Sequence, residues 1–227
     1  VTVDEEYAAY YDQLFDALLA NGITPMICLE HYELPGYLLE KYGGWGSKKV
    51  VELFVRYAEQ VFARYQLKVT RWFTFNEPIV VQTRVYLDAL RWPYEQNTST
   101  WMQWNYHKVL ATACVVKRFR ELGYPGTVGC ILNPEVTYPR SRAPHDLRAA
   151  EIYDLFYNRM FLDPLVHGVW PPALLALLEQ HQVTWEASAE ELAIIREHTV
   201  DELGINLYYP HRVKAPSRAW HPHTPFH

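Results

Sequence analysis

The residues with the clearest capacity for chemistry are Asn76 and Glu77, which follow an apolar, aromatic-rich run from Trp72 to Phe75. Such a run is typical of a buried strand, and Pro78 then ends the hydrogen-bonding ladder. We therefore expect the amide and the carboxylic acid at the C-terminal end of a strand. Apolar and aromatic neighbours tend to raise the pKa of a carboxylic acid, which suits a general acid. From these residues alone, the alternative is a strand that ends in a polar turn.

The elements that must position this pair alternate between strands and helices. Apolar runs predict strands at residues 23–29, 69–76, 127–132 and 202–208. Apolar residues at three- and four-residue spacing, together with start and stop signals, predict helices at 4–20, 47–65, 102–122, 145–162, 171–178 and 188–198. Thr2 with Glu5, and Ser188 with Glu191, have the spacing of a capping box. The long segment from 77 to 100 is expected to be functional or to carry small helices of its own.

Alternation of this kind implies parallel strands joined by right-handed crossovers. Polar or aromatic residues gather at the end of each expected strand, which is where α/β barrels place their chemistry. The rival architecture is a doubly wound sheet, but no glycine-rich phosphate loop follows any expected strand. Four strands do not close an eight-stranded barrel, so a barrel interpretation makes this chain about half of one.

Composition limits the class of protein. The chain has 227 residues, 49% hydrophobic and 21% charged, which is ordinary for a globular protein with a core. Its net charge of −5 argues against a nucleic-acid surface. No apolar run approaches the length of a membrane span, and no signal peptide stands at the start. The chain opens without an initiator methionine and directly into an expected helix, so we expect that the true N-terminus is missing.

Cysteine and histidine give no sign of a metal site. Cys28, Cys114 and Cys130 are odd in number, form no CxxC motif and lie in apolar stretches, so we expect buried free thiols in a reducing compartment. The tail carries three further histidines with no cysteine or carboxylate nearby, in a segment that prolines interrupt. Because a metal needs ligands held in a defined geometry, we expect no metal there. These tail residues are His221, His223 and His227.

Four motifs together resemble glycoside hydrolase family 1. Residues 74–78, Thr-Phe-Asn-Glu-Pro, are similar to the family's acid/base motif. His-Tyr-Glu-Leu-Pro at 31–35, Tyr-Gly-Gly-Trp at 42–45 and Gly-Ile-Asn-Leu-Tyr-Tyr at 204–209 fall in the family's order and spacing. The resemblance covers essentially the whole chain. It implies a (β/α)8 TIM barrel in which residues 1–227 form part of a single catalytic domain and supply the third to sixth βα units.

The resemblance also implies roles for five residues. Glu77 would be the general acid and then the general base, and Asn76 would bind the sugar 2-hydroxyl. His31 would bind another hydroxyl of the same sugar. Asn206 and Tyr208 would orient a nucleophilic carboxylate. Without the resemblance, Asn76 would be a strand-end cap, His31 a core histidine and Tyr208 part of an aromatic rim. The resemblance implies no cofactor and no metal, because two carboxylates supply the acid/base and the nucleophile of the family's reaction.

The nucleophile is the main departure from the family. Retaining glycosidases need two carboxyl groups roughly 5–5.5 Å apart. The family's Thr/Ser-Glu-Asn-Gly motif, which carries the second one, does not occur in these 227 residues, and the family's first-strand glutamine is also absent. Glu33 and Glu135 end strands, but neither occupies the nucleophile's place. We therefore expect the nucleophile outside this chain, and the chain by itself to be inactive.

The motifs also bear on the substrate. Many β-glucosidases of the family have His-Trp-Asp-Leu-Pro where this chain has His-Tyr-Glu-Leu-Pro. At residues 31–35 and 204–216 the sequence resembles the 6-phospho-β-glucosidases, which are bacterial cytoplasmic enzymes. The expected partner is thus a small carbohydrate, a 6-phosphorylated β-glucoside, whose phosphate-binding residues would lie beyond residue 227. Two alternatives remain open. One is a β-glucosidase or β-galactosidase acting on unphosphorylated sugars, and the other is a non-catalytic sugar-binding relative.

Overall fold

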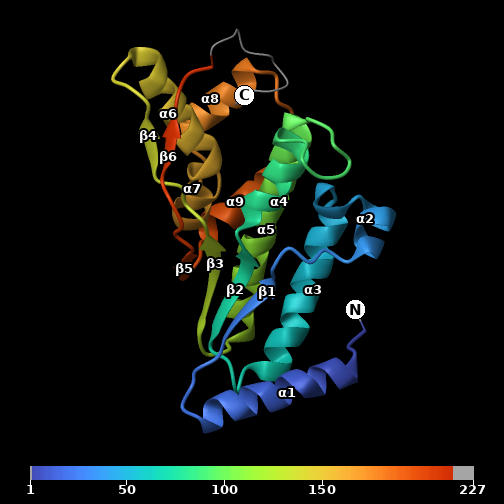
Figure 1. The fold of residues 1–227 in the computed structure, drawn as a ribbon. Coiled ribbons are helices and arrows are strands. Elements are labelled where there is room, and N and C mark those ends of the chain that lie inside the picture. Colours follow the sequence, from blue (N-terminus) through green and yellow to red (C-terminus); the bar gives the residue numbers. More distant parts are fainter. Residues whose placement is uncertain (1, 217–227) are drawn as a thin grey trace.

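A computed structural model describes residues 2–216, and its centre is a four-stranded parallel sheet (Figure 1). The strands lie in the order β1-β2-β3-β5, and each neighbouring pair is parallel. The predicted alternation and parallel direction are therefore confirmed. The fourth strand ends earlier than predicted, because residues 206–208 leave the ladder. The bounds are β1 (Met26–Glu30), β2 (Arg71–Asn76), β3 (Thr127–Leu132) and β5 (Glu202–Ile205).

Residues 2–216 contain nine α-helices, of which α1 precedes the first strand and the others lie between strands. They are α1 (Glu5–Ala20), α2 (Gly36–Tyr42), α3 (Lys48–Tyr65), α4 (Pro78–Gln82), α5 (Thr98–Leu122), α6 (Pro144–Tyr157), α7 (Arg159–His167), α8 (Pro172–Gln180) and α9 (Ala189–Glu197). A 3-10 turn, η1 (Gly44–Gly46), and a π-helical segment, η2 (Thr83–Leu87), complete the described helical structure. The small helices expected between residues 77 and 100 are confirmed as α4 and η2, whereas α2 was not predicted.

Three helix boundaries differ from the predictions. Helix α5 begins at Thr98 rather than at residue 102, because the Asn97 side chain caps its first turn by accepting from the Thr100 N–H at 2.9 Å. The expected helix at 145–162 is divided at Asn158, whose side chain binds the backbone N–H and C=O of Glu135 at 2.8 and 2.9 Å. At α1, Asp4 rather than Thr2 is the cap, because its carboxylate accepts from two free N–H groups of the first turn. The capping box of Ser188 and Glu191 is confirmed.

The core lies between the sheet and helices α3 and α5. Phe62 of α3 packs edge-on against Trp72 of β2 and Phe119 of α5, with ring centroids 5.0 and 4.9 Å apart. Phe54 stacks on Phe75 at 4.8 Å. The aromatic strand around residue 73 is thus buried as predicted, because large rings from both helices cover it and remove its apolar surface from water.

A buried ion pair interrupts this apolar core. Lys108 of α5 places Nζ 3.0 Å from Oε2 of Glu30, and the two side chains are only 2% and 8% exposed. The ammonium also lies 4.8 Å from the centroid of the Phe75 ring. Each charge needs the other, because an isolated buried charge is strongly unfavourable.

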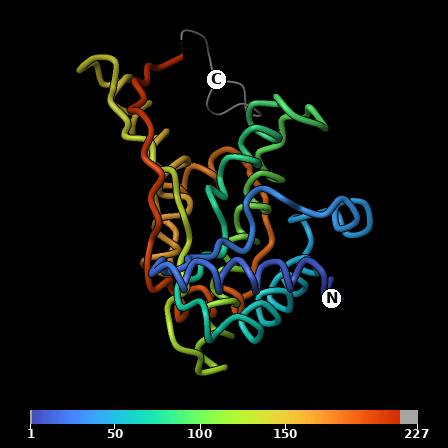
Figure 2. The backbone as a smooth tube through the Cα atoms, turned by 60° about the horizontal axis from the view of Figure 1, so that its bottom comes forward, coloured from blue at the N-terminus to red at the C-terminus, as the bar shows by residue number. Residues whose placement is uncertain are grey.

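The C-terminal ends of the four strands point to one end of the molecule, and α1 lies across the opposite end (Figure 1). Figure 2 shows that the green segment after β2 and the yellow segment after β3 lie on opposite sides of the end that carries the C-terminal strand ends. A small parallel pair, β4 (Thr137–Pro139) with β6 (His211–Val213), extends the yellow side and was not predicted. Two long connections therefore flank the place where the strands terminate.

The expectation of buried thiols holds for one cysteine. Cys130 is buried, whereas Cys28 and Cys114 are half-buried. Burial raises the pKa of Cys28 and Cys114 to about 11 and that of Cys130 to about 12, so all three are thiols at neutral pH. Over residues 2–216 no helix has the length and apolar character needed to cross a membrane. His221, His223 and His227 lie outside the described residues.

Candidate active site

Glu77 lies directly after β2, and its backbone is strained. Its φ of +48° is in the left-handed region, which non-glycine residues rarely adopt. Its N–H nevertheless donates to the carbonyl of Ile131 at 2.8 Å, which extends the contact between β2 and β3. The register of these strands shifts between Phe73 and Asn76. The irregular backbone aims the Glu77 side chain, which is only 6% exposed, into the region beyond the strand ends.

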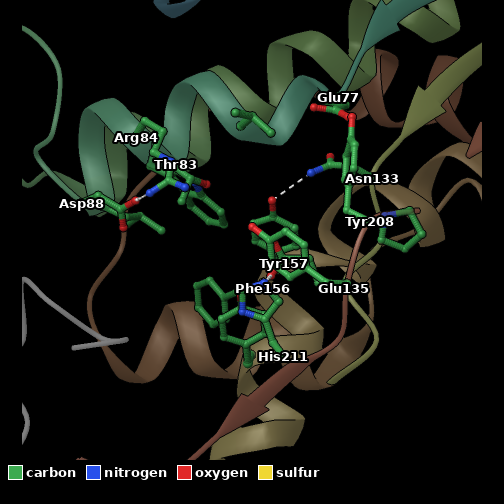
Figure 3. Close-up of a pocket in the computed structure, with 16 residues that line it drawn as sticks. Glu77, Thr83, Arg84, Asp88, Asn133, Glu135, Phe156, Tyr157, Tyr208 and His211 are labelled. Atoms are coloured by element: carbon green, nitrogen blue, oxygen red, sulfur yellow. Dashed lines mark hydrogen bonds and ion pairs between the residues drawn. The ribbon is translucent and has the colours of Figure 1, made fainter. Parts of the chain in front are cut away.

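Three side chains donate hydrogen bonds to the Glu77 carboxylate. Asn206 Nδ2 and the Tyr208 hydroxyl reach Oε1 at 2.8 and 2.6 Å, both from the segment after β5. The Tyr32 hydroxyl reaches Oε2 from the segment after β1. Figure 3 shows Glu77 and Tyr208 side by side at one edge of a pocket. The ends of three strands therefore meet on this one carboxylate.

These donors reverse the expected pKa shift of Glu77. Burial acts to raise the pKa, as predicted from its apolar neighbours. The hydrogen bonds from Tyr208, Tyr32 and Asn206, with a smaller electrostatic contribution from His31, act to lower it, and the net result is a pKa of Glu77 below its usual value. The prediction of a raised pKa is therefore wrong for this chain, because it did not include donors from distant segments.

The remaining predicted site residues join the same network. The Asn76 amide nitrogen lies 3.1 Å from Nε2 of His31, and its carbonyl oxygen accepts from Asn206 at 3.0 Å. Asn76 is buried, whereas His31 is exposed. All five predicted site residues are thus linked by contacts that end on Glu77. Sequence reasoning missed Tyr32, although it stands beside His31 in a motif that had been singled out and has a φ of +75°.

A cavity of about 400 Å³ opens beside Glu77 (Figure 3). This volume is in the range of small-molecule sites. Arg84 and Asp88, paired at 3.0 Å, form one wall in the segment after α4. The opposite wall comes from the end of β3, from α6 and from the segment before β6. Its polar and aromatic members are Asn133, Glu135, Tyr153, Phe156, Tyr157, Tyr209 and His211.

The sequence profile described as Glycosyl hydrolase family 1 matches residues 2–224. This chain belongs to that family. Among curated relatives, it is 38% identical to the 6-phospho-beta-glucosidase GmuD of Bacillus subtilis (strain 168), over 99% of this chain and 48% of the relative. It is 34% identical to the aryl-phospho-beta-D-glucosidase BglH of the same organism, over 90% of this chain and 44% of the relative. The family 1 chain described here thus spans about half the length of these relatives.

Solved structures give the same family and the fold. The virulence factor SghA from Agrobacterium tumefaciens has a TM-score of 0.87 and 31% identity, over 96% of this chain and 48% of its own. The psychrophilic beta-glucosidase BglU from Micrococcus antarcticus has a TM-score of 0.84 and 34% identity, over 93% of this chain and 45% of its own. The predicted (β/α)8 barrel is confirmed as the fold of the family 1 relatives, and the four parallel strands form part of such a barrel.

Proposed function

We propose that the protein containing this chain is a retaining β-glycosidase in which Glu77 is the general acid and then the general base. The observation that carries this proposal is the Glu77 carboxylate itself. It is buried at a strand end beside a cavity, and it accepts hydrogen bonds from side chains that follow two other strands. A family 1 chain with an intact Asn76–Glu77 pair in this position supports catalysis over a purely structural role.

In the first step, a nucleophilic carboxylate attacks the anomeric carbon while Glu77 gives its proton to the glycosidic oxygen. The sugar is then held as a glycosyl ester, and the leaving group departs as an alcohol. In the second step, Glu77 takes a proton from water as the water oxygen attacks the anomeric carbon. The ester breaks, the nucleophile is released, and the sugar keeps its original configuration. The nucleophile would come from outside these 227 residues.

The lowered pKa of Glu77 is consistent with this scheme. Asn206 and Tyr208, the proposed partners of the nucleophile, donate to Glu77 in the chain described here. With the nucleophile present, these donors would turn to it, and its negative charge would raise the pKa of Glu77. An acid that starts protonated at neutral pH needs that rise. Because the 227 residues lack the nucleophile that would supply this negative charge, we expect the chain alone to be inactive.

Asn76 and His31 are the proposed binding residues for the sugar next to the cleaved bond. The Asn76 amide would contact the 2-hydroxyl, a contact that strengthens as positive charge develops at the anomeric carbon. His31 is exposed, so its ring is available to a second hydroxyl. The proposed chemistry uses two carboxylates and no cofactor or metal.

The proposed substrate is a β-glucoside phosphorylated at its 6-hydroxyl, in a bacterial cytoplasm. GmuD and BglH, whose names specify phosphorylated β-glucosides, support this choice. The test compares 4-nitrophenyl 6-phospho-β-glucoside with 4-nitrophenyl β-glucoside on the full-length protein that contains this chain. We expect kcat/KM to favour the phosphorylated substrate by at least tenfold. Faster turnover of the plain glucoside would contradict this specificity and favour a β-glucosidase such as BglU. Sugar binding without turnover of either substrate would indicate a non-catalytic relative.

A further inference from the structure

A second cavity, of about 150 Å³, lies on the other side of the helical segment formed by α4 and η2. This segment gives Val80, Thr83 and Arg84 to the cavity beside Glu77, and Val81, Gln82 and Val85 to the second one, which we call the Gln82 cavity. Residues at this spacing lie on opposite faces of a helix, so the two cavities are separate. Tyr32 stands between them, because it lines the Gln82 cavity while its hydroxyl donates to Glu77.

Gln82 carries a buried amide without a partner. Its side chain is fully buried, and within residues 2–216 neither its Oε1 nor its Nε2 makes a hydrogen bond. Trp45 also lines the cavity and is buried, and its Nε1 likewise finds no acceptor in the described part of the chain. Because buried polar atoms are normally hydrogen-bonded and an unsatisfied amide is unfavourable, these groups indicate a ligand that both donates and accepts hydrogen bonds.

The charged groups that line the cavity favour a neutral ligand. Glu30 and Lys108 both belong to its wall, and their opposite charges, 3.0 Å apart, balance each other. Lys108 Nζ also lies 5.5 Å from the centroid of the Trp45 ring, so the ion pair adjoins the unpartnered indole. An anion would meet the Glu30 carboxylate and a cation would meet the Lys108 ammonium, and such like-charge contacts are unfavourable.

Apolar side chains and the volume of the cavity narrow the ligand further. Leu34, Leu39 and Trp104 present carbon surface to the cavity, which suits C–H groups. The volume is several times the roughly 30 Å³ that one water molecule occupies in the liquid. Waters filling it would lie against these apolar walls without hydrogen bonds, whereas a polyol offers carbon to the walls and hydroxyls to Gln82. The cavity is much smaller than the one of about 400 Å³ beside Glu77, so it suits a short, open-chain polyol.

We propose that the Gln82 cavity binds a small neutral polyol, of the size of erythritol, with the Gln82 amide as its main hydrogen-bonding partner. One hydroxyl of the ligand donates to Gln82 Oε1, and others accept from Gln82 Nε2 and Trp45 Nε1. Trp92 also lines the cavity and is 68% exposed, so this wall borders solvent and a ligand can enter there. The inference does not depend on the proposed function, because none of the five predicted site residues lines this cavity.

The test is a titration of erythritol into the full-length protein that contains this chain, followed through the NMR signals of the tryptophan indole N–H groups. The Trp45 signal is assigned by its loss in Trp45→Phe, and in the wild type it should shift to saturation. Gln82→Met keeps the length of the side chain and removes its donor and acceptor, so the dissociation constant should rise about tenfold or more. Gln13→Met makes the same exchange at an exposed position of α1, at the opposite end of the molecule from α4, and should bind as the wild type does (Figure 1).

Two matched probes and a stability measurement complete the test. Succinate and putrescine have the chain length of erythritol but carry net charge, and they should not shift the Trp45 signal. Gln82→Met replaces an unsatisfied amide, so its thermal unfolding midpoint without ligand should be no lower than that of the wild type. The proposal would be overturned by a wild-type signal that does not saturate, by equal affinity in Gln82→Met, or by charged probes that bind as tightly. A lowered midpoint of Gln82→Met, or ordered water alone beside Gln82 in a crystal soaked with erythritol, would overturn it as well.

Discussion

Asn206 Nδ2 lies 2.8 Å from Oε1 of Glu77, although 129 residues separate them and β3 lies between their strands. The Asn206 backbone N–H binds the carbonyl of Leu132 at the end of β3, which places its side chain over that strand. From there the same amide nitrogen also reaches the Asn76 carbonyl oxygen at 3.0 Å. One amide therefore fixes both members of the Asn76–Glu77 pair relative to the far edge of the sheet.

The hydroxyl of Tyr208 should contribute stability only where Glu77 is ionised. Hydrogen bonds to the carboxylate lower its pKa, so they stabilise the fold above the unfolded-state pKa of about 4.3. That contribution is lost as the pH falls through the lower, folded-state pKa. We expect Tyr208→Phe to reduce the free energy of unfolding at pH 7 and to reduce it less at pH 2, where Glu77 is more protonated. Urea unfolding of the 227-residue chain at both pH values measures this.

Tyr209→Phe is the matched control, because it removes a neighbouring, similarly exposed hydroxyl. It should give equal effects at the two pH values. A loss for Tyr208→Phe that is the same at pH 2 and pH 7 would mean that the hydroxyl does not stabilise the Glu77 carboxylate.

Asn76→Ala should weaken binding of the transition state. On the full-length protein we expect kcat/KM for a β-glucoside to fall about 10- to 100-fold, because the contact with the 2-hydroxyl strengthens as the bond breaks. The control is a 2-deoxy-β-glucoside, on which the same variant should show little further loss. Equal losses on both substrates would assign Asn76 to holding Glu77 and His31 in place rather than to binding the sugar.

Lys108→Met should destabilise the fold strongly. It leaves the Glu30 carboxylate buried without its cation, and breaking such a pair costs about 3–5 kcal/mol. The double variant Lys108→Met with Glu30→Gln removes both charges and should recover much of the loss. Urea unfolding measures both. A cost under about 1 kcal/mol for the single variant would show that water reaches Glu30 and solvates it.

Local patterns predicted the elements well where a short segment determines its own structure. The aromatic run of β2 and the capping box at Ser188 need only neighbouring residues, and both are confirmed. The five proposed site residues came from motifs, and the structure brings them into one network. Parallel strands place their C-terminal ends together, which is why residues far apart in sequence meet here.

Features that depend on distant partners were not predictable in this way. The break at Asn158 requires the backbone of Glu135, and β4 pairs with a strand more than 70 residues later in the chain. The pKa of Glu77 depends on Tyr32, Asn206 and Tyr208, whose hydrogen bonds exist only after folding. The apolar neighbours correctly indicated that burial raises the pKa of Glu77. They gave no information about the hydrogen-bond donors, which lower it.

The assignment of Glu77 as the general acid is tested most directly by its Gln variant with two leaving groups. The full-length protein and Glu77→Gln are compared on an alkyl and a 2,4-dinitrophenyl 6-phospho-β-glucoside, and the rate of bond cleavage is measured. The alkyl group needs a proton to leave, so we expect its cleavage to fall about 100- to 10,000-fold, whereas the dinitrophenyl group leaves as a stable anion and should be affected far less. Equal losses on both substrates, or an alkyl rate that survives in Glu77→Gln, would contradict the role of Glu77 as the acid.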